Sequence, residues 1–131
     1  MKSITVTQHV RVPLEDLFES LQTPGSHGWY ADHVLADDDV HVEMIAVDDR
    51  DWKITERATG ADGDRLTTGE LALFPLAADI TEVTFTQRFD RLPRRQRAVA
   101  PLLRRLVARA NRRALALLAA QHQQAALARA A

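Results

Sequence analysis

The sequence has no cysteine and no long hydrophobic run, and both absences exclude whole classes of protein. Without cysteine there is no disulfide, no thiol nucleophile and no cysteine-based zinc site. No stretch approaches the roughly 18 consecutive apolar residues of a transmembrane helix. The first residues alternate in polarity and do not form the apolar core of a signal peptide. We therefore expect no membrane span, and a cytoplasmic location is the simplest expectation.

An excess of charge of one sign is also missing, since 17 Lys and Arg stand against 18 Asp and Glu. Such a balance gives no bulk attraction to nucleic acid or to an anionic membrane. The chain lacks a glycine-rich phosphate loop and a nucleophile elbow. His41 and Glu43 have the spacing of a zinc deaminase motif, but that motif needs a downstream cysteine pair. The acidic turns lack the spacing of a calcium loop. We therefore expect no metal and no cofactor.

What the sequence does contain is enough apolar residues, 46% of 131, to build one domain over residues 1–131. The last third predicts a long amphipathic helix from near Ala100 to about Gln123, followed by a frayed tail at 125–131. Its arginines fall on a neighbouring arc, which is usually a solvated face. The apolar stripe expected to be buried consists of Val99, Leu103, Leu106, Val107, Ala110, Ala114, Leu117 and Leu118.

Upstream of this helix, alternating polarity predicts five strands, at about 4–12, 40–47, 52–57, 65–74 and 81–89. Pro13 ends the first strand and opens a helix at 14–21, and 26–33 is expected to form another short helical turn or a lid. Gly69 inside the fourth strand suggests a bulge. Because no helices alternate with the later strands, the sheet is expected to be antiparallel. The prediction is an α+β fold in which a curved antiparallel sheet wraps around the long C-terminal helix.

This order of elements resembles the START-like (helix-grip, or SRPBCC) superfamily, and within it the small bacterial polyketide cyclase/dehydrase-like proteins. The resemblance rests on the strand, proline and helix of residues 10–21, on Thr23-Pro24-Gly25 followed by Trp29, and on the hairpin of residues 73–89. Five strands are fewer than the six or seven usual in the family, and the usual glycine before the threonine of the last strand is absent. The resemblance implies a cavity between sheet and helix that holds a small hydrophobic molecule, such as a lipid or a polyketide.

Four polar residues share the inward parity of the strands or the apolar stripe of the helix: Gln8, Glu56, Gln87 and Gln121. One interpretation is that they line the pocket and orient the polar end of a ligand, with Glu56 as an acid or base of raised pKa. The alternative is that they lie near element ends, reach water or pair with arginine. For Glu56 the two interpretations are about equally good.

A second group consists of His27, Trp29, Tyr30 and His33, which would form a polar and aromatic gate at the mouth of the cavity. Alternatively, the two aromatic residues plug the end of the core and the histidines are solvated. Glu56, His27 and His33 are the weak candidates for catalysis. The residues expected to contact a ligand are Trp29, Tyr30, Trp52, Glu56, Phe85, Gln87, Leu103, Leu106 and Ala110.

Three functions follow from these observations and from the resemblance. The first is a binding module that encloses a small hydrophobic ligand. The second is an enzyme of the cyclase or dehydratase type that uses acid–base chemistry. The third is a co-chaperone-like interaction module. Nucleic acid is not expected as a partner, and a homodimer would be expected if the sheet is truncated and leaves an edge to cover.

Overall fold

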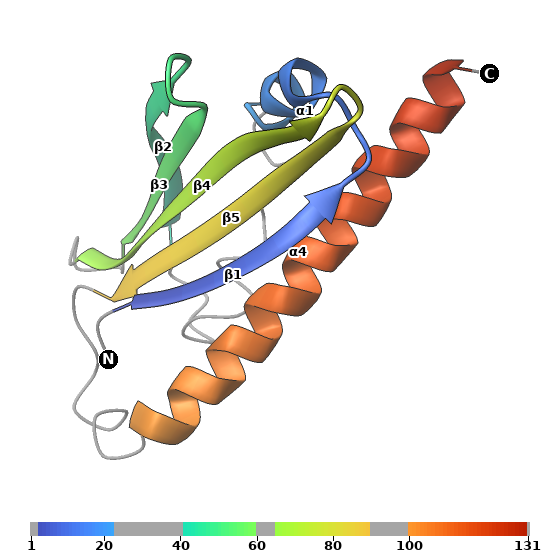
Figure 1. Cartoon of the computed structure of the whole chain (residues 1–131). Helices are drawn as coiled ribbons and strands as arrows, with labels where there is room; N and C mark the ends of the chain where they lie inside the picture. Colours follow the sequence, from blue (N-terminus) through green and yellow to red (C-terminus); the bar gives the residue numbers. More distant parts are fainter. Residues whose placement is uncertain (1–2, 23–40, 60–64, 90–99, 131) are drawn as a thin grey trace.

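The computed structural model describes residues 3–22, 41–59, 65–89 and 100–130, and it confirms the α+β prediction with five antiparallel strands. Figure 1 shows the arrangement, in which the long helix lies alongside one edge of the sheet. The elements in chain order are β1 (Ser3–Val10), α1 (Leu14–Leu21), β2 (His41–Asp48), β3 (Lys53–Thr59), β4 (Arg65–Ala77), β5 (Ile80–Phe89) and α4 (Ala100–Ala130).

The sheet has the order β1-β5-β4-β3-β2, so β1 and β2 are its two edges and β5 and β4 lie inside. Alternation along β5 buries Val83, Phe85 and Gln87, while Glu82 and Thr84 lie on the other face and are half-buried. This period of two gives the sheet one inner face, which carries the core. The described part of the opposite edge, β2 from Glu43 on, is exposed throughout.

Irregular pairing occurs at three places in the sheet, and Gly69 is not one of them. The register shifts fall between Met44 and Ala46, between Ala58 and Thr59, and between Pro75 and Ala77. Gly69 is paired in unbroken register with both neighbouring strands. The predicted bulge at this glycine is therefore wrong, and its missing side chain needs another explanation.

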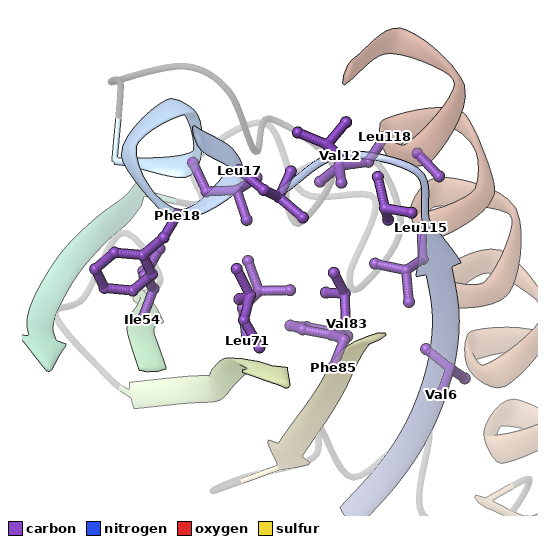
Figure 2. Close-up of a cluster of buried hydrophobic side chains, with 14 of the residues drawn as sticks. Val6, Val12, Leu17, Phe18, Ile54, Leu71, Val83, Phe85, Leu115 and Leu118 are labelled. Atoms are coloured by element: carbon purple, nitrogen blue, oxygen red, sulfur yellow. The ribbon is translucent and has the colours of Figure 1, made fainter. Parts of the chain in front are cut away.

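The helix α1 begins and ends as its sequence predicts. The backbone N–H of Leu17 donates to the carbonyl of Pro13 at 3.0 Å, and Glu15 and Asp16 occupy the first turn, where the helix dipole favours acids. Its buried side chains are Leu17, Phe18 and Leu21. Figure 2 shows Leu17 and Phe18 facing Ile54, Leu71, Val83 and Phe85 of the sheet. This apolar half of the inner face is therefore a filled core.

Trp52 lies in the turn before β3 and not in the strand where alternation placed it. The side chain of Asp48 accepts hydrogen bonds from the backbone N–H groups of Arg50 and Asp51, which closes the turn. Trp52 then has φ 56°, a left-handed backbone that is unfavourable for a bulky residue. Two contacts compensate for this strain: its carbonyl accepts a hydrogen bond from the Leu73 N–H at 2.9 Å, and its ring packs edge-on against Phe18.

The helix α4 runs to Ala130, so the end predicted near Gln123 is too early. It packs along β1, where the backbone N–H of Arg11 donates to Oε1 of Gln123 at 2.9 Å. Its fully buried side chains are Val107, Asn111, Leu115, Leu118 and Ala119. The predicted stripe is correct at Val107 and Leu118 but wrong at Leu106 and Leu117, which are more than half exposed. Both sides of this helix carry leucines, and packing against β1 selects only one of them.

Candidate functional site

Glu56, Gly69 and Gln87 form a row across the inner face of the sheet, beside the filled core, and we call it the polar row. Glu56 of β3 is paired with Gly69 of β4, and Gly69 is paired with Gln87 of β5. Adjacent strands are about 4.8 Å apart, so the Cα atoms of Glu56 and Gln87 lie roughly 10 Å apart. Since Gly69 has no side chain, no group of β4 stands between the carboxyl group and the amide at this level. The sheet thus presents two buried polar side chains on either side of a bare backbone position.

The amide of Gln87 is joined to the long helix. Nδ2 of Asn111 donates to Oε1 of Gln87 at 2.7 Å, and the two residues are 1% and 0% exposed. This bond links α4 to β5 and leaves the other end of the Gln87 amide available. Nε2 of Gln87 is buried and has no hydrogen-bond partner among the described residues. A buried donor of this kind costs about 1–3 kcal/mol when it stays unsatisfied, so an acceptor at this point would be stabilised.

The carboxyl group of Glu56 is a weaker acid than usual because it is buried. The residue is 4% exposed, and burial raises the pKa of its carboxyl group from 4.5 to about 7. Desolvation disfavours the charged form, so the group is close to half protonated at neutral pH. A carboxyl group in this state can donate or accept a proton, which is the property that the sequence-based hypothesis for Glu56 required.

The pair of amides also makes a prediction about stability. We expect Asn111→Leu to lower the free energy of unfolding by about 1–3 kcal/mol, because it leaves the buried Oε1 of Gln87 without its donor. The double variant Asn111→Leu with Gln87→Leu should recover most of this loss, because it removes both polar partners together. Urea denaturation of the wild type, both single variants and the double variant gives the coupling energy. Additive losses in the double variant would show that the two side chains do not depend on each other.

The other sequence-predicted residues are placed as follows. Phe85 is fully buried in the row next to Gln87, between Leu71 and Val6, where it is part of the core. Ala110 is half-buried on α4, whereas Leu106 is 55% exposed and lies away from the buried stripe. His27, Trp29, Tyr30 and His33 lie outside the described residues, and so does the side chain of Leu103. The structure therefore brings together Glu56, Gln87 and Phe85 from the predicted set.

Trp52 belongs to a different part of the molecule. It lines a surface depression of about 550 Å³ between the first turn of α1 and the turn that joins β4 to β5. It precedes Glu56 by four positions, which corresponds to roughly 13 Å along the direction of β3. The residues that share this depression are Pro13, Leu14, Glu15, Asp16, Pro75, Ala77 and Ala78. Trp52 is thus a support for α1 and not a neighbour of the polar row.

Of the remaining inward-parity residues, Gln8 is half-buried and its Nε2 donates to the carbonyl of His9 at 3.3 Å. Gln121 is exposed on α4. These two fit the alternative interpretation, in which a polar residue of inward parity lies near the end of an element and reaches a local partner or water. Burial therefore separates them from Glu56 and Gln87.

Sequence reasoning missed Asn111, although the sequence carried a signal for it. Asn111 is the only asparagine of the chain, and it interrupts the spacing of Val107, Leu115 and Leu118 on one side of the helix. Asparagine is a weak helix former, so its place in the middle of a helix rich in alanine and leucine indicates a specific partner. The prediction of a bulge at Gly69 likewise missed that this glycine lies between Glu56 and Gln87.

Within the described ranges, no three side chains of the kinds that bind metals gather in one place. Of the two helices that the structure describes, neither carries an apolar stretch that would reach across a bilayer.

No family model and no curated protein matches the chain, but many solved structures do. A Thermus thermophilus protein, TTHA0849, superimposes with a TM-score of 0.66 at 14% identity, over 95% of this chain and 98% of that one. Norcoclaurine synthase of Thalictrum flavum gives 0.60 at 14% identity, over 93% and 96%. A Streptomyces aromatase/cyclase gives 0.53 at 17% identity, over 86% and 90%.

These superpositions establish the fold. Sequence identities this low leave the activity open. The matches cover nearly the whole length of both chains, so the likeness extends to the complete arrangement of sheet and long helix. It includes the order of elements on which the sequence resemblance rested. The chain therefore has the helix-grip fold.

Proposed function

We propose that this protein binds a small, largely apolar molecule whose polar end lies over Gly69, between Glu56 and Gln87. The observation that carries the proposal is the buried row itself. A carboxyl group and an amide lie on either side of a glycine, and the amide is held by Asn111 so that its Nε2 remains a free donor among the described residues. Ligand sites of proteins combine apolar walls with a few converging polar groups of this kind.

The chemistry of the row indicates what the polar end of the ligand carries. Nε2 of Gln87 can only donate, so the ligand needs an acceptor such as a carbonyl or phenolic oxygen. The carboxyl group of Glu56 can receive a hydrogen bond when it is charged and donate one when it is neutral, and its pKa of about 7 makes both forms available. The apolar remainder of the molecule would extend from this row toward α4, away from the filled core. Two proteins of similar structure, a norcoclaurine synthase and an aromatase/cyclase, support a small organic molecule as the ligand.

Native mass spectrometry of the purified protein, followed by denaturation and extraction, tests the proposal. We expect an apolar molecule that bears a carbonyl or hydroxyl group to co-purify with the wild type in near-stoichiometric amount. The double variant Gln87→Leu with Asn111→Leu should retain at least tenfold less, because it removes the donor without leaving an unpaired amide. A matched control is Thr84→Val, a substitution on the opposite face of β5. Equal retention by the wild type and the double variant would contradict the proposal.

Acid–base catalysis is a second candidate function, and the raised pKa of Glu56 is the observation that favours it. The same extraction distinguishes it from simple binding. If Glu56 transfers a proton in a cyclisation or dehydration, Glu56→Gln should retain a molecule of different mass or ring structure from the one in the wild type. If the protein only binds, both forms should contain the same molecule in different amounts.

A further inference from the structure

The acidic residues of this chain are confined to its first 90 positions. Residues 1–90 contain all 18 acidic side chains and seven Lys and Arg, a net charge of −11, whereas residues 91–131 contain ten arginines and no acid, a net charge of +10. The overall charge of −1 conceals this division. Asymmetry on this scale indicates a surface that meets a partner of opposite charge.

The fold converts this division along the sequence into a division in space. The helix α4 packs along β1, at one edge of the sheet, and the acidic turn of the β2–β3 hairpin lies at the other edge (Figure 1). Six arginines of α4 are exposed, and four of them lie together on one arc of the helix: Arg105, Arg109, Arg112 and Arg113. None of them forms an ion pair with a carboxylate among the described residues, where the one ion pair is His9 with Glu82. Within the part of the chain that the structure describes, these arginines therefore have no carboxylate partner.

The same side of α4 carries large apolar side chains. Leu102, Leu106 and Leu117 are 59%, 55% and 59% exposed, and Leu127 is 72% exposed. On a helix of 3.6 residues per turn, the first three fall within about 60° of one another, roughly opposite the centre of the buried side at Asn111 and Leu115. The four arginines occupy the adjoining arc. The exposed face of α4 therefore combines leucines with arginines, and we call this set of eight residues the leucine–arginine face.

We propose that the leucine–arginine face docks this protein onto an anionic lipid surface. A helix that lies in a membrane interface inserts its apolar side chains among the acyl chains and places its cations against anionic headgroups. Arginine suits this position because its long stem lies along apolar groups while the guanidinium stays in water. Nucleic acid would need the arginines but not four exposed leucines. A second helix of the same kind would bring the arginines of both copies together.

This inference is independent of the ligand site, because it uses only the outer side of α4. It also gives the molecule an orientation, since the acidic hairpin at the other edge of the sheet would be repelled by an anionic surface. The protein would then lie with α4 along the lipid and with the β2–β3 hairpin turned away. It would not cross the bilayer.

Vesicle flotation with the full chain tests the proposal. We expect binding to phosphatidylcholine vesicles that contain about 30% phosphatidylglycerol, at least tenfold weaker binding to phosphatidylcholine alone, and loss of binding between about 50 and about 500 mM NaCl. The variants Leu106→Gln with Leu117→Gln, and Arg109→Gln with Arg113→Gln, should each bind at least tenfold more weakly. Because all four residues are exposed, both variants should keep the circular dichroism of the wild type. The matched control, Arg50→Gln with Lys53→Gln on the far hairpin, should bind within twofold of the wild type.

Three outcomes would overturn the proposal. One is absence of binding to either vesicle, or equal binding to both. Another is tighter binding to a short DNA duplex that the leucine variant retains and the arginine variant loses, which would assign the face to nucleic acid. The last is a dimer in light scattering that the leucine variant abolishes while vesicles remain unbound, which would assign the face to a second copy of the chain.

Discussion

Replacing Gly69 by valine should abolish ligand retention while the protein stays folded. The position lies in a regular stretch of β4 between Glu56 and Gln87, and its side of the strand is the buried inner face. Valine suits a strand better than glycine does, which favours the folded state by up to about 1 kcal/mol. Its two methyl groups would occupy the place that we assign to the polar end of the ligand. We expect at least a hundredfold loss of binding to the fluorescent apolar probe ANS, and the same loss of any co-purified molecule.

The control is Ala72→Val, three residues further along the same strand and on its other face. It places the same valine side chain on β4 without reaching the inner side, so probe binding should remain within about twofold of the wild type. Urea denaturation of both variants completes the test. If the space over Gly69 were filled by protein side chains, valine would overpack it and lower the free energy of unfolding by about 1–3 kcal/mol. That result, with probe binding unchanged, would place the ligand elsewhere.

The second large effect is a dependence of stability on pH that comes from Glu56. Its pKa is about 7 in the folded protein and 4.5 in an unfolded chain, so between these values the folded state binds more protons. The free energy of unfolding contributed by this group therefore falls as pH rises from 4.5 to 7, and it is constant above about pH 8. Integrated over the window, the loss amounts to about 3 kcal/mol. Glu56→Gln removes the titration and should be more stable than the wild type by up to that amount at pH 8.

Urea denaturation at about pH 5, 6, 7 and 8 measures this difference. At pH 5 the difference in stability between the wild type and Glu56→Gln should shrink to about 1 kcal/mol, because the carboxyl group is then mostly protonated in the folded state and resembles the amide. The control is Glu43→Gln on the exposed edge strand β2, which should follow the wild type at every pH. Parallel curves for the wild type and Glu56→Gln would show that the charged carboxylate is as stable in the fold as in water. In that case Glu56 would lose its part in acid–base chemistry.

Local pattern was sufficient to predict most of the elements. The alternation of residues 81–89 is strong enough to determine β5, and Pro13 followed by Leu14, Leu17, Phe18 and Leu21 determines α1. Both patterns act over neighbouring residues, so they hold whatever the rest of the chain does. The inward positions of Glu56 and Gln87 follow from the same period of two.

Positions that depend on a partner far away in the sequence could not be predicted in this way. Trp52 has the parity of β3, but the Asp48 side chain closes a turn in which its backbone becomes left-handed. Gly69 is compatible with either a bulge or a gap in a row of side chains, and only its unbroken register with two other strands decides between them. Both cases depend on hydrogen bonds whose partners periodicity does not identify.

The choice of which side of α4 is buried shows most clearly what the sequence determined and what the tertiary structure decided. By itself the sequence determined that residues from Ala100 on form an amphipathic helix, because alanine, leucine and arginine are strong helix formers. It offered leucines on two sides, and only the tertiary structure decided which side is buried. The side that contains Asn111 faces the sheet, since Gln87 there accepts its hydrogen bond, α4 packs along β1, and Val107 and Leu118 on this side are buried. The opposite side keeps Leu106 and Leu117 in contact with solvent, because one sheet edge can cover only one face of a straight helix.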